Sequence, residues 1–587
     1  MRSDTDNRAV SIPRLWGVVL VVGLLAAGGV ARSQEASPVQ PQGLDHVGVY
    51  ALRAIDPSLT GEGVRFGIVS RSVTYTDGEP QNDYQPNMAH ACLRGAALQF
   101  VDDGTLPGGV SFHSTAICSI LFGVDASGTS PGLDPFLYQG AVPAAEGQVY
   151  EFMHFLTEHV STRTAPEVDV VAASVGWPLE AWWTRGIEAL VEHEGLVVVG
   201  SIGNGANASD PPMYPGASAN TIGVGVVSSV KAADPATSLS HFALAYPERS
   251  SVGPTADGRC KPDLIAPGNC LVAGTAAPRT YDVSGDWSSY ATPVAAGVVG
   301  LLIQTAKQDE ALGAVLSADG GNCALKAILM SSATKLPFWH KGRLSTADDR
   351  EVPLDFVQGA GMVDAVAGHQ LLTAGQAGPG DVPSVGWDLN DLEAAQGLPQ
   401  VYRMVVDEPA GKVLTATLVW NRHYGAEYPF DRVADGDSDL RIEVWAVDPG
   451  DSSNDLLLDY CDSRVDNVEH IHMPMLPEYH VYELVVSHSD LQRPAAIRDL
   501  ERYGLAWRVG AKPESDSILW NDLNADGIVD QADFAVFLSN RSLGLTTPDA
   551  YVIGDMNDDG EIDGSDLEKL FANLQRTADW HPGTAAN

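Results

Sequence analysis

A chain of 587 residues exceeds what one hydrophobic core usually supports, so the length predicts two to four domains. Aspartate and glutamate number 76 against 35 lysines and arginines, and the formal net charge is -41. A surface this acidic repels phosphate backbones and anionic lipid headgroups, so nucleic acid is excluded as an expected partner. Most of these charges predict only a soluble surface, although clustered carboxylates also bind hard cations.

The N-terminus contains an apolar run at residues 17–31, with the sequence GVVLVVGLLAAGGVA. The run has the length of a signal-peptide core and is shorter than a membrane span needs. Small residues Ala31 and Ser33 stand three and one positions before Gln34, which fits cleavage there. We therefore predict a signal peptide at residues 1–33 and a secreted or cell-surface protein. A single uncleaved anchor is the alternative, and no later segment is expected to insert stably into a membrane.

Six cysteines are spread along the chain without a CxxC pair, so the sequence does not predict a zinc site. In an exported protein an even number of cysteines permits disulfides, and Cys260 and Cys270 are the pair closest in sequence. Buried free thiols are the alternative, and the sequence leaves the pairing open.

After a Pro/Gln/Ser-rich spacer at residues 34–42, short β-branched runs alternate with amphipathic helical stretches over residues 43–374. This alternation is typical of a parallel sheet covered by helices. Almost continuous apolar runs predict buried strands at residues 64–69, 168–173 and 196–201. In such sheets ligands bind beyond the carboxyl ends of the strands.

The composition shifts to Gly, Pro and Val at residues 375–386, which predicts a linker. Residues 387–512 then read as short strands separated by Asp/Gly/Pro turns, and the expected strands are 401–406, 414–420, 440–447, 482–488 and 503–509. This spacing predicts an all-β sandwich. A final acidic module, residues 519–575, contains an internal repeat.

Three separated segments resemble the active-site motifs of subtilases, the subtilisin-like serine proteases. FHSTAICSI places His113 at the family's histidine, VVVGSIGNGA places Asn204 at the oxyanion-hole position, and SSYATPVAAGVVGLL places Ser289 at the nucleophile, where a helix begins. SSVGPTADGRCKPDLIAPG and YPGASANTIGVGVV match family segments that have no catalytic duty. The resemblance covers about residues 43–372 and implies a subtilisin-like α/β fold, a parallel sheet with helices on both faces.

The resemblance also implies a reaction. A serine hydroxyl is a weak nucleophile at neutral pH and needs a neighbouring base, the role implied for His113. Asn204 would donate a hydrogen bond to the oxyanion of the tetrahedral intermediate. The segment DVVAASVGW, with Ser174 and Gly176, resembles the family's edge to which an extended peptide adds as a strand. The implied function is a serine endopeptidase that acts on peptide or protein substrates.

One position departs from the family at the catalytic chemistry. The family's first motif places an aspartate at the end of a strand, and the aligned segment FGIVSRS has Ser70 there. Replacing this aspartate by asparagine in a serine protease triad lowers kcat by about 10⁴-fold, because the carboxylate orients the imidazole and stabilises its charged form. Asp77, Asp56 or the pair Asp102 and Asp103 are candidates for a carboxylate supplied from another loop.

Further departures lie beside the nucleophile. Trp287 and Ser288 replace the family's Gly-Thr, and Ala116 stands at its second histidine. A bulky Trp287 is expected to crowd the approach to Ser289. Two hypotheses follow: a secreted serine endopeptidase of reduced activity, and a catalytically impaired peptide-binding or scaffold protein anchored by its C-terminal module. No pair of glycosidase carboxylates is recognisable, so sugar hydrolysis is not predicted.

The segments SDLRIEVWAV and LLLDYCDSRVDNVEHIHMP resemble the β-sandwich that follows the catalytic domain in a group of bacterial subtilases. The resemblance implies a sandwich that packs against the catalytic domain and stabilises it. Carbohydrate or surface binding is the alternative.

The last module carries two copies of a calcium-loop pattern, in which oxygen ligands alternate and a glycine at position 6 makes a sharp turn. The side chains at positions 1, 3, 5, 9 and 12 are Asp522, Asn524, Asp526, Asp530 and Asp533 in the first copy and Asp555, Asn557, Asp559, Asp563 and Asp566 in the second. Gly527 and Gly560 occupy position 6, and the backbone carbonyls of Ile528 and Glu561 occupy position 7. The pattern predicts Ca²⁺ as a cofactor.

A helix is expected only after each loop, and position 12 is Asp, which together resemble a dockerin more than an EF-hand. A dockerin-like, α-helical double-loop module implies a cohesin-like or cell-surface partner, or membership of a polysaccharide-degrading assembly. Residues 531–532 and 564–565 lack the Ser/Thr pair with which many dockerins contact cohesins. Calcium loops that only fold the tail are the alternative.

Overall fold

The computed structural model describes residues 38–69, 74–76, 79–205, 211–245, 249–276, 278–393, 398–433, 438–489, 500–511, 520–547 and 550–581. These residues belong to one compact unit, residues 38–587. The predicted signal peptide, Ser70 and Asp77 lie outside the described residues.

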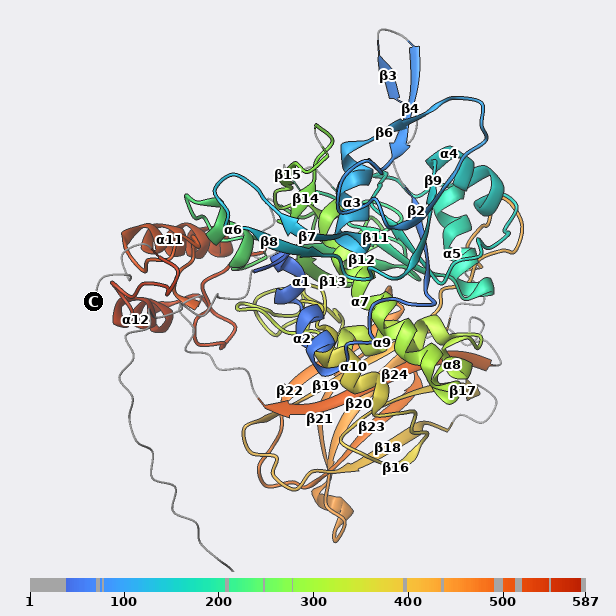
Figure 1. The fold of residues 1–587 in the computed structure, drawn as a ribbon. Coiled ribbons are helices and arrows are strands. Elements are labelled where there is room, and N and C mark those ends of the chain that lie inside the picture. The colour runs from blue at the N-terminus through green and yellow to red at the C-terminus, as the bar shows by residue number, and fades with distance from the viewer. Residues whose placement is uncertain are drawn as a thin grey trace, which may run out of the picture. The chain divides into compact units, whose positions relative to one another are not determined.

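Seven parallel strands form the central sheet (Figure 1). In spatial order they are β13 (Leu264–Pro267), β12 (Ile222–Val227), β11 (Val197–Ser201), β10 (Val170–Ala173), β2 (Arg65–Val69), β9 (Glu146–Tyr150) and β5 (Ala97–Val101). The predicted strands at 64–69, 168–173 and 196–201 are confirmed as β2, β10 and β11, three neighbours in the sheet. Their carboxyl ends therefore meet at one edge, where Ser70, Ser174 and Asn204 follow in sequence.

Helices cover both faces of this sheet. They are α3 (Phe112–Phe122), α4 (Phe152–Phe155), η1 (Leu156–Val160), α5 (Trp182–Glu194), α7 (Ser288–Gln308), α9 (Gly321–Ser332) and α10 (Ala365–Thr373). Val170 and Ala172 of β10 lie in the same core as α3 and α7, whereas Val171 and Ala173 pack with η1 and α5. Successive side chains of a strand point to opposite faces, so this division confirms the predicted sheet with helices on both sides.

Helix α7 is long and apolar enough to cross a membrane by length and composition alone. Its apolar window is 89% buried inside the protein. The helix contacts β10, β11, β12 and β13, so it is the central core helix of the sheet.

The remaining elements before the sandwich are short. They are β1 (Val39–Gln40), α1 (Gln42–His46), α2 (Val49–Ile55), β3 (Thr74–Thr76), β4 (Glu79–Gln85), β6 (Gly108–Val110), β7 (Val124–Gly128), β8 (Phe136–Gln139), α6 (Pro235–Ser240), β14 (Leu271–Ala273), β15 (Tyr281–Val283) and α8 (Glu310–Leu316). Strand β1 pairs with β8, so structure begins inside the predicted spacer at 34–42.

Two antiparallel layers follow. One sheet has the order β16 (Gly380–Val382), β18 (Gln400–Val405), β23 (Val481–His488), β20 (Leu440–Val447) and β21 (Leu456–Cys461); the other has β17 (Val385–Glu393), β24 (Leu500–Ala511), β19 (Lys412–Trp420) and β22 (Val468–Pro474). Among the described strand pairs of these two sheets, β16–β18 is the parallel one. Side chains of both sheets share one core that includes Tyr402, Trp420 and Trp507, as a sandwich requires.

The predicted linker at 375–386 needs a correction. Residues 380–382 form strand β16, which pairs with β18, and β17 already begins at Val385. Glycine and proline composition predicted a loop, but pairing with the neighbouring strand made an edge strand of it.

The sandwich lies directly on the sheet-and-helix domain. Helix α9 packs against β24 and β19, and the backbone N–H of Cys260 donates to the Asp466 carboxylate at 2.8 Å. The Arg422 guanidinium donates to Asp257 at 2.7 Å. Cys260 and Asp257 belong to the GPTADGRCKPD stretch, so this segment with no catalytic duty serves as the docking surface of the sandwich.

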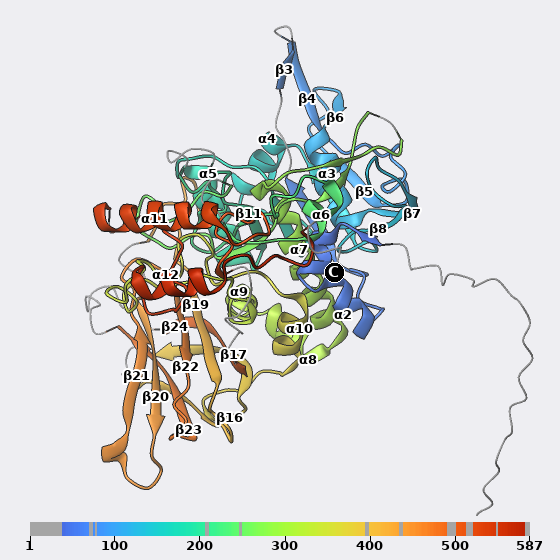
Figure 2. The same ribbon diagram turned by 90° about the vertical axis from the view of Figure 1, so that its left-hand side faces the viewer.

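The C-terminal module includes two helices, α11 (Gln531–Thr546) and α12 (Gly564–Ala572), each beginning at position 10 of a predicted loop (Figure 2). Leu523, Phe537 and Leu570 of the module share a core with Val230 and Leu244 of the first domain.

All six cysteines are buried free thiols. The sequence had left disulfide pairing and buried free thiols open, and the structure shows the free thiols.

Candidate active site

Ser289 is the second residue of α7, and Trp287 precedes the helix as its N-cap. The first four N–H groups of a helix have no partner within it. Here the Ser288 N–H donates to Asn204 Oδ1 at 3.0 Å, and the N–H groups of Tyr290 and Ala291 donate to the Trp287 carbonyl. No acceptor for the Ser289 N–H is found among the residues that the structure describes, so this N–H could donate a hydrogen bond to a ligand.

The carbonyl of Ser289 is also released from the helix. Pro293 stands four residues later and has no N–H to donate to it. The Ser174 hydroxyl donates to this carbonyl instead, at 2.9 Å. Ser174, which is 3% exposed, thus ties the end of β10 to the nucleophile position. A peptide strand would then pair with the backbone of this segment, since the Ser174 side chain is already engaged.

Asn204 is held in one orientation by Ser288. Its Oδ1 accepts from the Ser288 N–H at 3.0 Å and from the Ser288 hydroxyl at 2.9 Å. Ser288 itself is fixed, because its Oγ contacts Ser201 Oγ at 2.6 Å and accepts from the Gly203 N–H at 3.2 Å. Oδ1 is engaged twice by Ser288, and Nδ2 has no acceptor among the described residues, so Nδ2 is the group of Asn204 that could donate to a ligand.

His113 is the second residue of α3, and α3 packs against α7. The His113 ring lies 5.8 Å from the ring of Tyr290, centroid to centroid. Tyr290 directly follows Ser289, so the structure brings the predicted base beside the predicted nucleophile from segments 176 residues apart. The three residues taken from the resemblance, His113, Asn204 and Ser289, therefore gather at one place.

Three of the four candidate carboxylates have other partners. Asp56 accepts from the N–H and hydroxyl of Ser58, and Asp103 accepts from those of Thr105. Asp102 accepts from the Tyr84 hydroxyl at 2.7 Å. These hydrogen bonds hold Asp56 and Asp103 within their own turns and hold the Asp102 carboxylate against Tyr84 of β4. The fourth candidate, Asp77, lies outside the described residues, as does Ser70.

Trp287, the unusual neighbour of the nucleophile, is half-buried. A Cβ on Gly285 would stand 3.0 Å from Trp287 Nε1, so the indole packs closely over this glycine. Gly285 has a φ of 83°, a left-handed conformation that favours glycine. Because Gly285 has no side chain, the Trp287 indole has space to pack against it.

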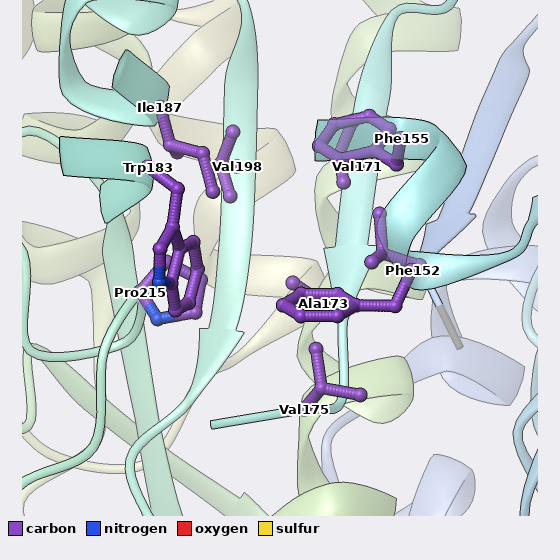
Figure 3. A pocket seen from close by; sticks show the side chains of 10 residues that line it. Phe152, Phe155, Val171, Ala173, Val175, Trp183, Ile187, Val198 and Pro215 are labelled. Carbon is purple, nitrogen blue, oxygen red and sulfur yellow. The ribbon is translucent and has the colours of Figure 1, made fainter. Parts of the chain in front are cut away.

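The segment after β10 borders an apolar pocket (Figure 3). Gly176 is required by close approach, because a Cβ there would stand 2.7 Å from Met213 Cβ. Val175 lines the pocket, and the rings of Phe152 and Trp183 meet edge to face across it at 5.4 Å. Ten apolar residues line the pocket, but its volume is only about 10 Å³, about enough for one water molecule, so these side chains pack as core and leave no room for a ligand side chain.

The two predicted calcium loops adopt the same conformation. Gly527 and Gly560 have φ angles of 87° and 83°, as the turn at position 6 requires. The Asp522 carboxylate accepts from the Gly527 N–H, and Asp555 accepts from the Gly560 N–H, each at 2.8 Å.

The aspartate at position 12 makes the same hydrogen bond in both loops. Asp533 and Asp566 are 0% exposed and accept from the N–H groups of Asp530 and Asp563, each at 2.8 Å. Burial is the main cause that raises the pKa of Asp522 to about 6, and the neighbouring carboxylates add to it. Within the described ranges no three His, Cys, Asp or Glu side chains already converge as a metal site. Asn524, Asn557 and two backbone carbonyls belong to the predicted ligand set besides the acidic side chains.

The fold and the site define a subtilisin-like class of protein. The model of the subtilase family, peptidase S8, matches residues 69–361, so the chain contains a subtilase domain. C5a peptidase of Streptococcus pyogenes is 36% identical over 129 residues, which make up 22% of this chain and 9% of that protein. C5a peptidase of serotype M18 has the same identity over 10% of its length, so the matches span about a tenth of these relatives.

Two solved structures are similar to parts of this chain at low sequence identity and low TM-score. The prenylagaramide maturation protease PagA is 17% identical, with a TM-score of 0.36, over 55% of this chain and 98% of that chain. The self-cleaved protease domain of PatA is 18% identical, with a TM-score of 0.36, over 54% of this chain and 98% of that chain.

Sequence reasoning missed the role of Ser288 and the structural role of Ser174. The signal for Ser174 was present, because Pro293 four residues after Ser289 leaves a carbonyl that needs a donor. No sequence pattern indicated that the donor would come from residue 174.

Proposed function

We propose that this protein is a serine endopeptidase that hydrolyses peptide bonds, with Ser289 as nucleophile, His113 as general base and Asn204 as oxyanion donor. The observation that carries the proposal is the pair of donors beside Ser289. One is the Ser289 N–H, which has no acceptor among the described residues, and the other is the Asn204 amide, fixed by Ser288. Two such donors beside a serine hydroxyl are what acyl transfer requires.

In the proposed reaction, His113 removes the proton of the Ser289 hydroxyl while Oγ attacks the substrate carbonyl. The oxyanion then accepts hydrogen bonds from the Ser289 N–H and Asn204 Nδ2. His113 returns the proton to the leaving amine, and a water molecule activated by His113 hydrolyses the acyl-enzyme. With Ser70 at the aspartate position, the family's carboxylate is missing from its usual place in the sequence, so we expect the reaction to be slow.

The substrate is proposed to bind as an extended strand along residues 174–176. These residues continue β10 beyond its carboxyl end, and Gly176 is exposed. Main-chain hydrogen bonds to this segment would give the affinity for the peptide.

A catalytically impaired peptide-binding or scaffold protein is the second candidate. It is favoured by the carboxylates of Asp56, Asp102 and Asp103, which are held by Ser58, Tyr84 and Thr105. In this candidate the same strand segment binds a peptide without efficient cleavage.

Calcium is proposed as the cofactor of the C-terminal module. The side chains of Asp522, Asn524, Asp526, Asp530 and Asp533, with the carbonyl of Ile528, would hold one Ca²⁺, and Asp555, Asn557, Asp559, Asp563, Asp566 and Glu561 would hold a second. The donor chemistry fits, since hard oxygen ligands surround two glycine turns. A bound cation would offset the burial of several carboxylates close together.

Export by the N-terminal segment and attachment through the C-terminal module complete the proposal. The outer sides of α11 and α12 expose Leu538, Leu545 and Phe571. A cohesin-like or cell-surface partner would bind there, since the loops themselves contact the first domain.

The test is hydrolysis of a mixture of unstructured peptides by the calcium-loaded protein, followed by mass spectrometry. We expect internal cleavage that disappears in Ser289→Ala and His113→Ala. Binding of the same peptides without cleavage would favour the scaffold candidate.

A further inference from the structure

A groove runs from the residue before the nucleophile helix to the C-terminal module. Its volume is about 990 Å³, and its lining includes Ser228, Lys231, Trp287, Leu523, Val536 and Tyr551. The first three belong to the subtilase domain and the last three to the module. We call it the module groove.

The strand order places this groove opposite the proposed acyl-side strand. Residues 228–232 follow β12, whereas Ser174 follows β10, and β11 with Asn204 lies between these two strands. A peptide that pairs with residues 174–176 and crosses the oxyanion donors of Asn204 and Ser289 therefore continues toward the groove. This continuation is the part of the peptide beyond the scissile bond.

The module groove begins close to Ser289. Trp287 stands two residues before Ser289, and consecutive Cα atoms are 3.8 Å apart, so the groove begins within about 8 Å of the nucleophile. An extended peptide advances roughly 3.3 Å per residue. Its second or third residue after the scissile bond would already contact the groove.

The side of the groove that the C-terminal module forms, with Leu523, Val536 and Tyr551, is called the module wall. Specific contacts hold it in place. The Lys231 N–H donates to the Ala525 carbonyl at 2.8 Å. Val230, on the subtilase side, lies in one core with Leu523 and Phe537 of the module. The wall is thus continuous with the subtilase domain, and its position relative to Trp287 is defined.

The described lining of the groove carries more positive than negative side chains. Lys231 and Arg249 line it and are exposed. Among the described lining residues the acidic side chain is Asp286, which accepts hydrogen bonds from the N–H and hydroxyl of Ser229. Burial raises the pKa of Asp286, and the charge of Arg249 acts in the opposite direction. Against a formal net charge of -41, two cations at one groove favour an anionic ligand.

We propose that the module groove binds the segment of a peptide that follows the scissile bond and selects acidic side chains there, so the C-terminal module takes part in substrate recognition. The inference rests on the proposed function for the direction of the peptide. It gives the module a role at the active site, in addition to any attachment role.

The test uses the full-length Ser289→Ala protein, so that binding is measured without cleavage. Two fluorescein-labelled peptides share one sequence, except that Asp and Glu in the second to fourth positions after the intended scissile bond are replaced by Asn and Gln. We expect the acidic peptide to bind about fivefold tighter at low salt, with the difference shrinking as salt is raised. Equal affinities would overturn the proposal.

A pair of substitutions on the module wall tests the site itself. Val536→Glu is expected to weaken binding of the acidic peptide, and Val536→Lys to strengthen it, because both perturb the half-buried position similarly but differ in charge. Ser542→Glu, at an exposed position of α11 outside the groove lining, is the control and should change nothing. The same effect for both Val536 variants, or an effect of Ser542→Glu as large, would contradict a site in the groove.

The two proposals fail separately. If the wild-type protein cleaves no peptide but the charge effects at Val536 hold, the endopeptidase proposal fails and the groove stands. If the wild-type protein cleaves peptides and their charge has no effect on binding, the groove proposal fails alone.

Discussion

Asn204 and Ser288 form a two-point contact, in which Asn204 Oδ1 accepts from the Ser288 N–H at 3.0 Å and from the Ser288 hydroxyl at 2.9 Å. The contact joins the end of β11 to the start of α7. It fixes the oxyanion donor relative to Ser289, so the donor needs no reorganisation during the reaction.

Removing this donor should lower turnover more than binding. Losing one oxyanion-hole donor in subtilisin costs about 10²–10³ in kcat. We expect a loss of this size for Asn204→Ala with KM little changed, because the oxyanion exists only in the transition state. Steady-state kinetics on a peptide substrate measures it. A rise in KM at constant kcat would show that Asn204 only helps to bind substrate.

Restoring the family's carboxylate should raise activity. Ser70 directly follows β2, the strand beside β10 in the central sheet. In Ser70→Asp we expect kcat to increase, by up to about 10⁴-fold if the rest of the site is intact. The pH profile should gain a limb that reports the stabilised imidazolium. Ser70→Asn is the matched control, and an equal gain in both variants would exclude a role for the charge.

Calcium removal should destabilise both the module and the subtilase domain, because Val230 and Leu244 lie in one core with the module. At a Ca²⁺ concentration 100 times Kd, binding adds about 2.7 kcal/mol per site. Chelation should lower Tm and speed hydrogen exchange in residues 228–244.

Variants of position 12 test the same claim. Asp533→Asn and Asp566→Asn should reduce the effect of Ca²⁺ on Tm, whereas Glu568→Gln, an exposed acid of α12 outside the loops, should not. A Tm independent of Ca²⁺ in the wild-type protein would refute calcium binding by the loops.

His423 predicts a loss of stability at alkaline pH. Its ring contacts Glu192 of α5 at 2.6 Å and Glu501 of β24 at 3.1 Å, so it joins the subtilase domain to the sandwich. Burial lowers the pKa of His423, but the hydrogen bonds to both glutamates outweigh burial and raise it to about 9. Since the folded-state pKa is raised, the stabilisation is complete below the usual value of 6.5 and disappears as pH rises through about 9.

The shift corresponds to roughly 2–3 kcal/mol near neutral pH. Urea unfolding of the wild-type protein between pH 7 and pH 10 should show this loss, and His423→Gln should show a flatter profile. Parallel profiles for the two proteins would remove His423 as the cause.

The sequence predicted the elements that depend on local pattern. The apolar runs gave β2, β10 and β11, and the resemblance placed His113, Asn204 and Ser289 in one site. Contacts between distant segments were beyond it, because they depend on the packed domain. The Cys260 N–H to Asp466 bond and the Ser174 hydroxyl on the Ser289 carbonyl are two such contacts. The strand β16 was missed because its pairing with β18 overrode a loop-like composition.

Labelling of the purified, calcium-loaded protein with a fluorophosphonate tests the central claim most directly. The reagent modifies a serine only where a base and oxyanion donors activate it. We predict one adduct by intact mass in the wild-type protein and none in Ser289→Ala. Absence of an adduct on well-folded wild-type protein would contradict an activated Ser289 and favour the peptide-binding scaffold.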